Sequence, residues 1–424
     1  MSITKNGLIL GATALTAGSV ALTGFGLHYS QTQAFVRESP KEIVDEVWQV
    51  INSRYVDATF NGQDWRSIRN EFLEREYASK EEAYEAVREM LKTLDDPYTR
   101  FMNPEEFRSM QIDTSGELTG VGIQITKEEE TNNIVVVAPI EDTPASEAGI
   151  MAKDIITKID GQSTEGMELN DAVNLIRGVP GSNVVLTIQR DNREIDFDLT
   201  RAKIEIKPVR TRIEEDPNVG RVAYIRLVQF SNNASAEMRE AIAQAESENV
   251  NGYILDLRSN PGGLLYSSVE ISRMFINQGR IVTTVDRVGE VDGHQANGRA
   301  LTDKPLVVLV DGGSASASEI VSGALQDNDR ATIVGTQTFG KGLVQSVRGL
   351  SDGSGLAVTI SKYLTPDGRD IDKEGITPDV VYELSEEERE LIASDRQKLG
   401  TREDGQFRRA FEVLSDKITR TAQN

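Results

Sequence analysis

Residues 306–319 read LVVLVDGGSASASE, and this stretch decides the fold of the C-terminal half of the chain. Five apolar residues, Leu306–Val310, predict a buried strand, and the glycine pair that follows predicts a turn. A helix is then expected to begin among the serines and to continue to Gln326. From Gly220 onward, further strands and helices alternate in the same way, which predicts an α/β core.

Three serines, Ser314, Ser316 and Ser318, follow this turn. The start of a helix presents free backbone N–H groups and a positive dipole end, which together can stabilise an oxyanion. A serine in this place is therefore a candidate nucleophile. The same three serines could equally be ordinary helix caps.

A second stretch, TFGKGLVQ at residues 338–345, favours the nucleophile over the helix caps, because it isolates a lysine among glycines. The chain has no cysteine and only two histidines, so lysine is the best available base for a serine. Lys341 would need its pKa lowered by roughly 3 units from about 10.4, which burial can supply. Gln345 could accept a hydrogen bond from its amine. The alternatives are a solvated loop lysine and a strand-surface amide.

The turn Asn260-Pro261-Gly262-Gly263 follows a second apolar strand, predicted at residues 252–257. Loops at the carboxyl ends of strands form sites in α/β folds, so an N–H group of this turn could help to hold an oxyanion. A plain connecting turn is the alternative. The nearby Asp256 and Arg258 could simply pair with each other.

The composition limits the possible binding partners of the protein and its cellular location. A net charge of −22 argues against nucleic acid, and solubility explains it adequately. Without cysteine, and with two histidines, no metal site and no cofactor are expected. Lys5, the uncharged segment 7–27 and the small residue Ala34 are typical of an export signal, or of an uncleaved membrane anchor. In either case the body of the protein works outside the cytoplasm.

Two further regions precede the α/β core. Residues 40–110 show helical periodicity, with a second helix from about Asp64 to Arg75 and a third that Ser79 caps. Residues 116–203 show short strands separated by glycine turns. Within them, the loop Gly120-Val121-Gly122-Ile123 could capture a carboxylate through successive N–H groups while the strand edge pairs with an extended peptide.

Together these motifs resemble the carboxyl-terminal processing proteases, also called tail-specific proteases. The resemblance rests on SASASEI at 314–320, LQDN at 325–328, TFGKG at 338–342, LDLR at 255–258, NPGG at 260–263 and DPYT at 96–99. The segment YVDATFNGQ at 55–63 is similar to the branch from photosynthetic organisms, which trims a photosystem II reaction-centre precursor in the thylakoid lumen. One departure is Lys153-Asp154, where many members have Gly-Asp.

The resemblance implies a multidomain α+β fold. Its parts are a signal or anchor at 1–34, an N-terminal helical domain at 35–115, a small β-rich PDZ domain at 116–203, an α/β serine-protease core similar to the crotonase/ClpP-type fold at 204–384, and a charged helical tail at 385–424. The implied localisation is the thylakoid lumen or the periplasm.

The resemblance also implies roles for individual residues. Ser316 is the nucleophile, Lys341 the general base, Gln345 orients the lysine, and Glu319 is a supporting residue. The N–H groups of Gly262 and Ala317 form the oxyanion hole. In the PDZ domain, Val121, Gly122 and Ile123 bind the carboxylate of a substrate.

The implied function is a serine endopeptidase that captures the carboxyl terminus of a protein substrate and removes a C-terminal extension. The substrate expected from the photosynthetic branch is a photosystem II precursor, and membrane association through residues 7–27 is expected if the anchor is retained. A catalytically silent peptide-binding scaffold is the alternative function. Acyl-CoA chemistry, suggested by the crotonase likeness, fits poorly with a PDZ domain and an export signal.

Overall fold

The computed structural model describes residues 39–423, except residues 116, 129–130, 141–142, 192, 206 and 290. The predicted export signal or anchor at 1–34 lies outside the described residues. Within the described part of the chain, no helix is both long enough and apolar enough to cross a membrane.

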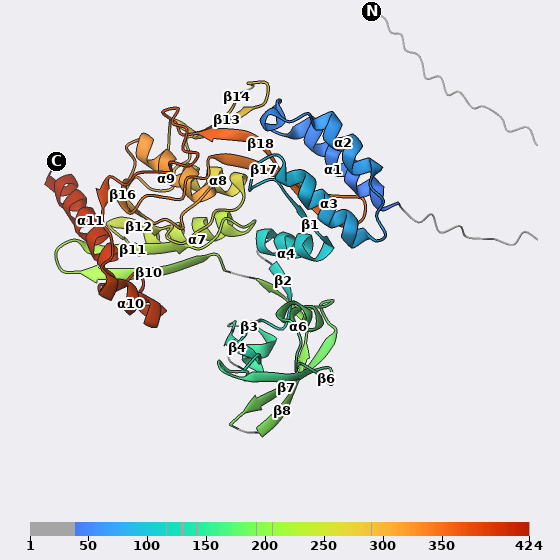
Figure 1. Ribbon diagram of the computed structural model, residues 1–424. Helices are drawn as coiled ribbons and strands as arrows, with labels where there is room; N and C mark the ends of the chain where they lie inside the picture. Colours follow the sequence, from blue (N-terminus) through green and yellow to red (C-terminus); the bar gives the residue numbers. More distant parts are fainter. Residues whose placement is uncertain are drawn as a thin grey trace, which may run out of the picture. The chain divides into compact units, whose positions relative to one another are not determined.

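The first described elements are helices, as predicted from the periodicity (Figure 1). Asp64 and Ser79 cap two of them, because Ser67 N donates to Asp64 Oδ1 at 3.1 Å and Glu82 N donates to Ser79 Oγ at 3.2 Å. The elements are α1 (Pro40–Arg54), the 3-10 turn η1 (Phe60–Gly62), α2 (Trp65–Glu74), α3 (Lys80–Lys92), β1 (Arg100–Met102) and α4 (Pro104–Ser115). Their buried faces share one core with Leu356 and Val358 of a distant strand. These helices therefore pack onto the sheet that contains this strand, which is described below.

The middle segment forms a small sheet of order β3-β4-β5-β7-β8, with β6 beside β5, and a separate pair β2-β9. The strand predicted at 121–126 begins only at Ile123, because Gly122 takes a φ of 83° in the break between β2 and β3. The elements are β2 (Glu117–Gly120), β3 (Ile123–Lys127), β4 (Ile134–Pro139), α5 (Pro144–Glu147), β5 (Ile155–Ile159), β6 (Gln162–Ser163), α6 (Leu169–Ile176), β7 (Asn183–Arg190), β8 (Arg193–Thr200) and β9 (Ala202–Glu205).

The C-terminal half contains the predicted alternation of strands and helices. Its first sheet has the order β10-β11-β12-β15-β16-β19, antiparallel between β10 and β11 and parallel elsewhere. The strands are β10 (Val209–Asp216), β11 (Gly220–Leu227), β12 (Gly252–Asp256), β15 (Leu306–Val310), β16 (Thr332–Gly335) and β19 (Val380–Val381). Because β12 and β15 are parallel neighbours, the turns after them meet at one edge of the sheet.

Helices cover both faces of this first sheet. α7 (Ala234–Ser247), α8 (Leu265–Phe275) and α9 (Ala317–Asp327) share a large apolar core with one face. α11 (Gly405–Gln423) packs on the opposite face through Phe407, Phe411 and Leu414. Between β19 and α11 lie α10 (Glu386–Ser394) and the 3-10 turn η2 (Arg396–Lys398).

A second, antiparallel sheet has the order β1-β18-β13-β14, with β17 also paired to β18. Its C-terminal strands are β13 (Arg280–Asp286), β14 (Val291–Gln295), β17 (Leu343–Gly349) and β18 (Gly355–Leu364). The hairpin of β17 and β18 was predicted, whereas β1, β10 and β14 were not. β17 pairs on one side only, and it begins two residues after Lys341.

Candidate active site

Ser316 lies between β15 and α9 in a conformation that L-residues rarely adopt, with φ 54° and ψ −111°. Such backbone strain persists only where the surroundings enforce it, and it clusters at functional sites. Ser314 and Ser318 are fully buried and have structural roles, because their hydroxyls donate to Leu257 O at 2.8 Å and to Asn260 O at 2.9 Å. Ser316 is therefore the candidate nucleophile among the three serines.

The turn at 260–263 lies directly against Ser316. A Cβ added to Gly262 would stand 2.9 Å from both Ala317 N and Ser316 Cβ, and one added to Gly263 would stand 2.4 Å from Phe230 O. Both glycines also have positive φ, 102° and 141°. Only glycine allows this close approach of the turn to the start of α9.

The predicted oxyanion donors differ in their availability. Ala317 N is the first N–H of α9 and has no partner within the helix. The N–H of Gly262 already donates to Asn260 Oδ1 at 2.9 Å. Within the described part of the chain, the N–H of Gly263 has no acceptor. In this arrangement Ala317 offers a free donor, and Gly262 offers one only if Asn260 shares or releases it.

Glu319 ties the serine turn to the lysine loop. Its side chain is fully buried, and its Oε2 accepts from Ser316 N at 2.8 Å and from Lys341 N at 2.9 Å. Its Oε1 accepts from Thr338 Oγ1 at 2.6 Å and from Gly340 N at 2.7 Å. Four donors thus satisfy the buried carboxylate, which fixes the backbone of Lys341 relative to that of Ser316.

Lys341 is half-buried, and burial lowers the pKa of its amine. The positive charge of Arg100 lowers this pKa further, while Asp96 and Glu319 oppose the shift. The amine, Nζ, lies 4.8 Å from the centroid of the Tyr98 ring. Among the described residues, no hydrogen bond joins this amine to Ser316 Oγ or to Gln345.

Gln345 lies on β17, and its Nε2 is buried without a hydrogen-bond partner. A buried amide without a hydrogen-bond partner costs free energy. We therefore expect this side chain to bond to a group that does not reach it in this structure. The predicted bond between Lys341 and Gln345 is one that would satisfy this amide, with the amide turned to present its oxygen.

One cavity of about 980 Å³ brings these groups together. Ser316, Ala317, Lys341 and Gln345 line it, together with Gly263 of the turn. The sequence reasoning missed its other wall, which comes from Pro97, Tyr98 and Arg100 and from Phe107, Met110, Gln111 and Thr114 of α4. The signal that pointed there was DPYT at 96–99, which was interpreted as a turn. Neither His294, on β14, nor residues 121–123 line this cavity.

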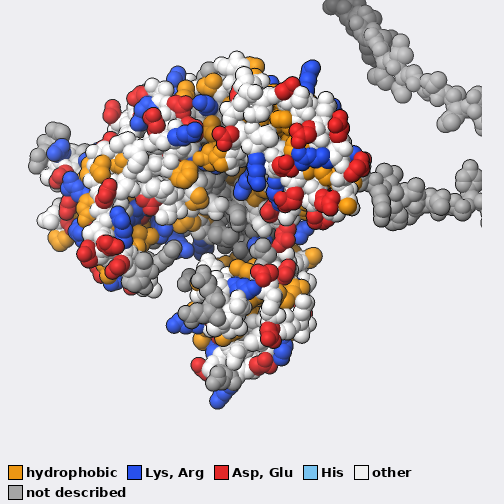
Figure 2. Space-filling view, viewed as in Figure 1, with side chains coloured by type: hydrophobic (Ala, Val, Ile, Leu, Met, Phe, Trp, Pro, Cys, Tyr) orange, Lys and Arg blue, Asp and Glu red, His pale blue; other side chains and the backbone are white. Residues whose placement is uncertain are grey.

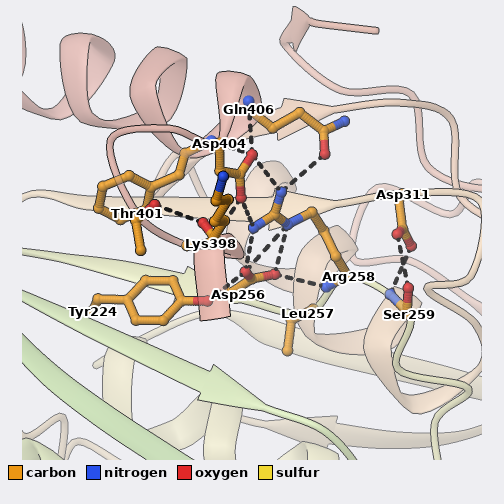
Figure 3. Close-up of polar contacts among 12 residues, drawn as sticks. Tyr224, Asp256, Leu257, Arg258, Ser259, Asp311, Lys398, Thr401, Asp404 and Gln406 are labelled. Atoms are coloured by element: carbon orange, nitrogen blue, oxygen red, sulfur yellow. Dashed lines mark hydrogen bonds and ion pairs between the residues drawn. The ribbon is translucent and has the colours of Figure 1, made fainter. Parts of the chain in front are cut away.

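A buried polar cluster surrounds Arg258, two residues before the turn at 260–263 (Figure 3). Arg258 pairs with Asp256 at 2.6 Å and with Asp404 at 2.7 Å, and it also donates to Gln406 Oε1 at 3.0 Å. Tyr224 completes the cluster by donating to Asp256 Oδ2 at 2.7 Å. The predicted pairing of Asp256 with Arg258 is confirmed, and the cluster gains two partners from the C-terminal segment.

The candidate carboxylate loop of the middle segment contains N–H groups without an acceptor. In the described part of the chain, the N–H groups of Val121 and Gly122 have no acceptor. A Cβ at Gly122 would stand 2.3 Å from Thr143, so the loop needs a glycine there. Ile123 opens β3 directly after it.

The described residues contain no group of three or more His, Cys, Asp and Glu side chains placed to hold a metal ion. The cavity itself presents a serine hydroxyl, an amine of lowered pKa and backbone N–H groups.

Comparison with known proteins gives two matching family models. Residues 221–382 match Peptidase family S41, and residues 135–190 match a PDZ domain. The carboxyl-terminal-processing protease of Synechocystis sp. is 47% identical over 352 residues, which cover 82% of either chain. The chloroplastic carboxyl-terminal-processing peptidase 2 of Arabidopsis thaliana is 42% identical over 345 residues, which cover 79% of this chain and 67% of the relative.

A solved structure, titled photosystem II D1 C-terminal processing protease, is 38% identical and has a TM-score of 0.55. The match covers 81% of this chain and 93% of that one. A putative S41 protease from Bacteroides fragilis, at 17% identity and a TM-score of 0.55, shares the fold.

Proposed function

Because the chain belongs to the carboxyl-terminal-processing proteases of peptidase family S41, a family of serine proteases, we propose that Ser316 and Lys341 form its catalytic dyad. The observation that carries the proposal is the shared cavity. It joins the one strained serine of the motif to an amine whose pKa is lowered.

The dyad accounts for both halves of peptide hydrolysis. Neutral Lys341 takes the proton of Ser316 Oγ as this oxygen attacks the scissile carbonyl carbon, and the resulting ammonium then protonates the leaving amine. Water hydrolyses the acyl-enzyme in the same way. The N–H groups of Ala317 and Gly262 hold the oxyanion, the latter once Asn260 shares it.

The lysine must be aimed before this can happen. Its amine leaves the face of Tyr98 and approaches Ser316, and Gln345 accepts one of its hydrogen bonds. The hydrogen bonds from Ser316 N and Lys341 N to the Glu319 carboxylate, which we call the Glu319 clamp, keep the backbone of both dyad residues in place during this movement. The unpartnered Gln345 amide and the position of the Lys341 amine over the Tyr98 ring support this two-position lysine.

The chain acts on the carboxyl termini of proteins and carries a PDZ domain. We assign the carboxylate of the substrate to the N–H groups of Val121, Gly122 and Ile123, and the tail beyond the scissile bond to the cavity. A solved relative is titled a photosystem II D1 processing protease, and several relatives are chloroplastic. A photosystem II reaction-centre precursor in the thylakoid lumen, or a periplasmic counterpart, is the substrate that this kinship favours.

The remaining parts of the prediction belong to the same proposal. These are the domain limits 35–115, 116–203, 204–384 and 385–424, the crotonase/ClpP-type likeness of the core, and a signal or anchor at 1–34 that associates the protein with the membrane if it is retained.

The test is cleavage of a tailed protein substrate followed by mass spectrometry, with wild type, Ser316→Ala and Lys341→Arg. We expect no cleavage by either variant, because Ala has no nucleophile and Arg stays charged at any working pH. Lys362→Arg, an exposed lysine on β18, is the matched control and should keep full activity. Cleavage by Ser316→Ala would exclude the dyad, and wild type that binds tails without cutting them would indicate a silent peptide-binding scaffold.

A further inference from the structure

The catalytic cavity is cationic in a protein that is strongly acidic overall. The chain has 68 Asp and Glu against 46 Lys and Arg, yet the described residues that line the cavity include Lys341, Arg100 and Arg348 and no carboxylate. Figure 2 shows this face hollowed near its middle, with Lys or Arg and hydrophobic side chains at the edge of the hollow. A local reversal of charge at a cleft attracts a ligand of opposite sign.

Both arginines are free to bind such a ligand. Both side chains are exposed, and in the described part of the chain neither the Arg100 nor the Arg348 guanidinium makes a hydrogen bond or an ion pair. A guanidinium presents a rigid fork of N–H donors that matches a carboxylate.

The register of the second sheet places the two arginines on either side of one strand. Arg100 of β1 is opposite Ala357 of β18, and Arg348 of β17 is opposite the adjacent Leu356, so the register directs Arg100 to the face of Ala357 and Arg348 to the other face of the sheet, although both residues line the cavity. Neighbouring strands are about 4.8 Å apart, so the two backbone positions are separated by roughly 10 Å. Ala357, a small residue, lines the cavity between them and leaves room for a bound group.

Arg100 is also close to the proposed chemistry. It follows Tyr98, whose ring lies beneath the Lys341 amine, by two residues. Its charge is one of those that act on that amine. A carboxylate held at Arg100 would therefore belong to a substrate residue within a short distance of the scissile bond.

We propose that Arg100, on the same face of the sheet as the cavity-lining Ala357, forms a subsite that selects substrates carrying a carboxylate in the segment that occupies the catalytic cavity. This inference rests on the proposed function, since it assigns a specificity to the same cleft. The carboxylate has two chemical sources, an Asp or Glu side chain of the segment and the free terminus of a short extension. Arg100 is a specificity-determining residue in this arrangement, separate from the PDZ carboxylate loop.

The experiment compares two pairs of peptides that contain one cleavable sequence. The first pair has Asp or Asn in the segment beyond the scissile bond, and the second ends in a free acid or an amide. kcat/KM is measured for wild type, Arg100→Gln, Arg348→Gln and the control Arg299→Gln. Arg299 is an exposed arginine that does not line the cavity. Any PDZ contribution to the second ratio is common to all four proteins, so the differences between them report the subsite.

We expect wild type and Arg299→Gln to prefer one charged peptide by about tenfold, the size of a well-formed charge-assisted hydrogen bond. In Arg100→Gln that preference should fall to within about twofold, with a smaller fall in Arg348→Gln. The pair whose ratio collapses identifies the source of the carboxylate. If Arg100→Gln were misfolded by circular dichroism, Arg348→Gln would carry the test.

Equal ratios in wild type and both arginine variants would overturn the subsite while leaving the dyad intact. Failure of the proposed function has a different signature, because wild type would then cleave none of the four peptides or Ser316→Ala would cleave them all.

Discussion

At the scale of single residues, the proposed chemistry depends on keeping one amine neutral. Burial disfavours the ammonium form of Lys341, and the positive charge of Arg100 disfavours it further. Asp96 and Glu319 limit the shift without cancelling it. Position and protonation of this amine are thus set by groups from β1, α9 and the loop before β1.

The first prediction is the direction of the pH dependence. Because the base is the neutral amine, kcat/KM should rise with pH through the lowered pKa of Lys341 and then level off, with a midpoint below that of an ordinary lysine near 10.4. Arg100→Gln removes a positive neighbour, so its midpoint should move to higher pH. A pH–rate series on a neutral peptide measures both, and a profile that is flat or falls from acid to alkaline pH contradicts lysine as base.

A second prediction concerns the Glu319 clamp, which holds the backbones of Ser316 and Lys341 together. Glu319→Gln replaces one acceptor oxygen by an NH₂ group that faces two donors, so at least one buried donor loses its partner at a cost of about 1–3 kcal/mol. We expect lower thermal stability and a kcat reduced by about tenfold or more, because Ser316 and Lys341 are no longer held together. Glu374→Gln, exposed in the same region, is the matched control. A Glu319→Gln enzyme with normal kcat would show that the Glu319 clamp stabilises the fold but does not position the two residues for catalysis.

At the scale of elements, the start of α11 and the end of β12 depend on each other. The single guanidinium of Arg258 pairs with two buried carboxylates, Asp256 and Asp404. It also donates a hydrogen bond to the side-chain oxygen of Gln406. The Asp404 carboxylate also accepts from Gly400 N at 2.8 Å and Gln406 N at 3.0 Å. This cluster therefore fixes the C-terminal helix to the strand that leads into the turn at 260–263.

The element-scale prediction follows from that dependence. Asp404→Asn removes a buried charge partner of Arg258 and one acceptor of the helix start, and it should lower the free energy of unfolding by about 2–4 kcal/mol. Asp416→Asn makes the same change of charge at an exposed position of the same helix and should stay within about 0.5 kcal/mol. Urea denaturation at neutral pH compares the two, and similar values for both would contradict the structural role of the cluster.

A turn of the middle sheet supplies another prediction. Lys153 is exposed and has a φ of 71°, the left-handed region that favours glycine, at the position where the resemblance leads one to expect Gly. Lys153→Gly should therefore raise stability by about 0.5–1 kcal/mol, the relieved strain exceeding the added entropy of the unfolded chain. Differential scanning calorimetry tests this, with Lys153→Ala as the control that keeps a Cβ and gains nothing.

At the scale of the whole molecule, the sequence predicted the elements that carry an apolar pattern. The helix predicted at 265–275 coincides with α8, and the buried strands β12 and β15 lie where the apolar runs placed them. β10 and β14 were missed because charged and polar residues dominate them, and β1 because its three residues acquire a partner only from β18, more than 250 positions later.

The same limit applies to the candidate site. Ser316, Lys341, Gln345, Ala317 and the glycine turn were predicted because they lie in short motifs of the C-terminal half. Tyr98 and Arg100, which face the amine, come from a segment more than 200 residues earlier, and no local pattern connects them to it. The engagement of Gly262 N–H by Asn260 also depends on a side-chain rotamer that spacing does not specify.

The cluster around Arg258 has a consequence for how the enzyme matures during synthesis. The residues that complete it, Asp404 and Gln406, lie beyond the matched S41 segment and close to the end of the chain. Ribosomes deliver a protein from its N-terminus, so Ser316 and Lys341 are both made before the buried guanidinium acquires its last partners. A chain that stops before Asp404 would therefore contain Ser316 and Lys341 while the buried Arg258 lacks the two partners that this segment supplies.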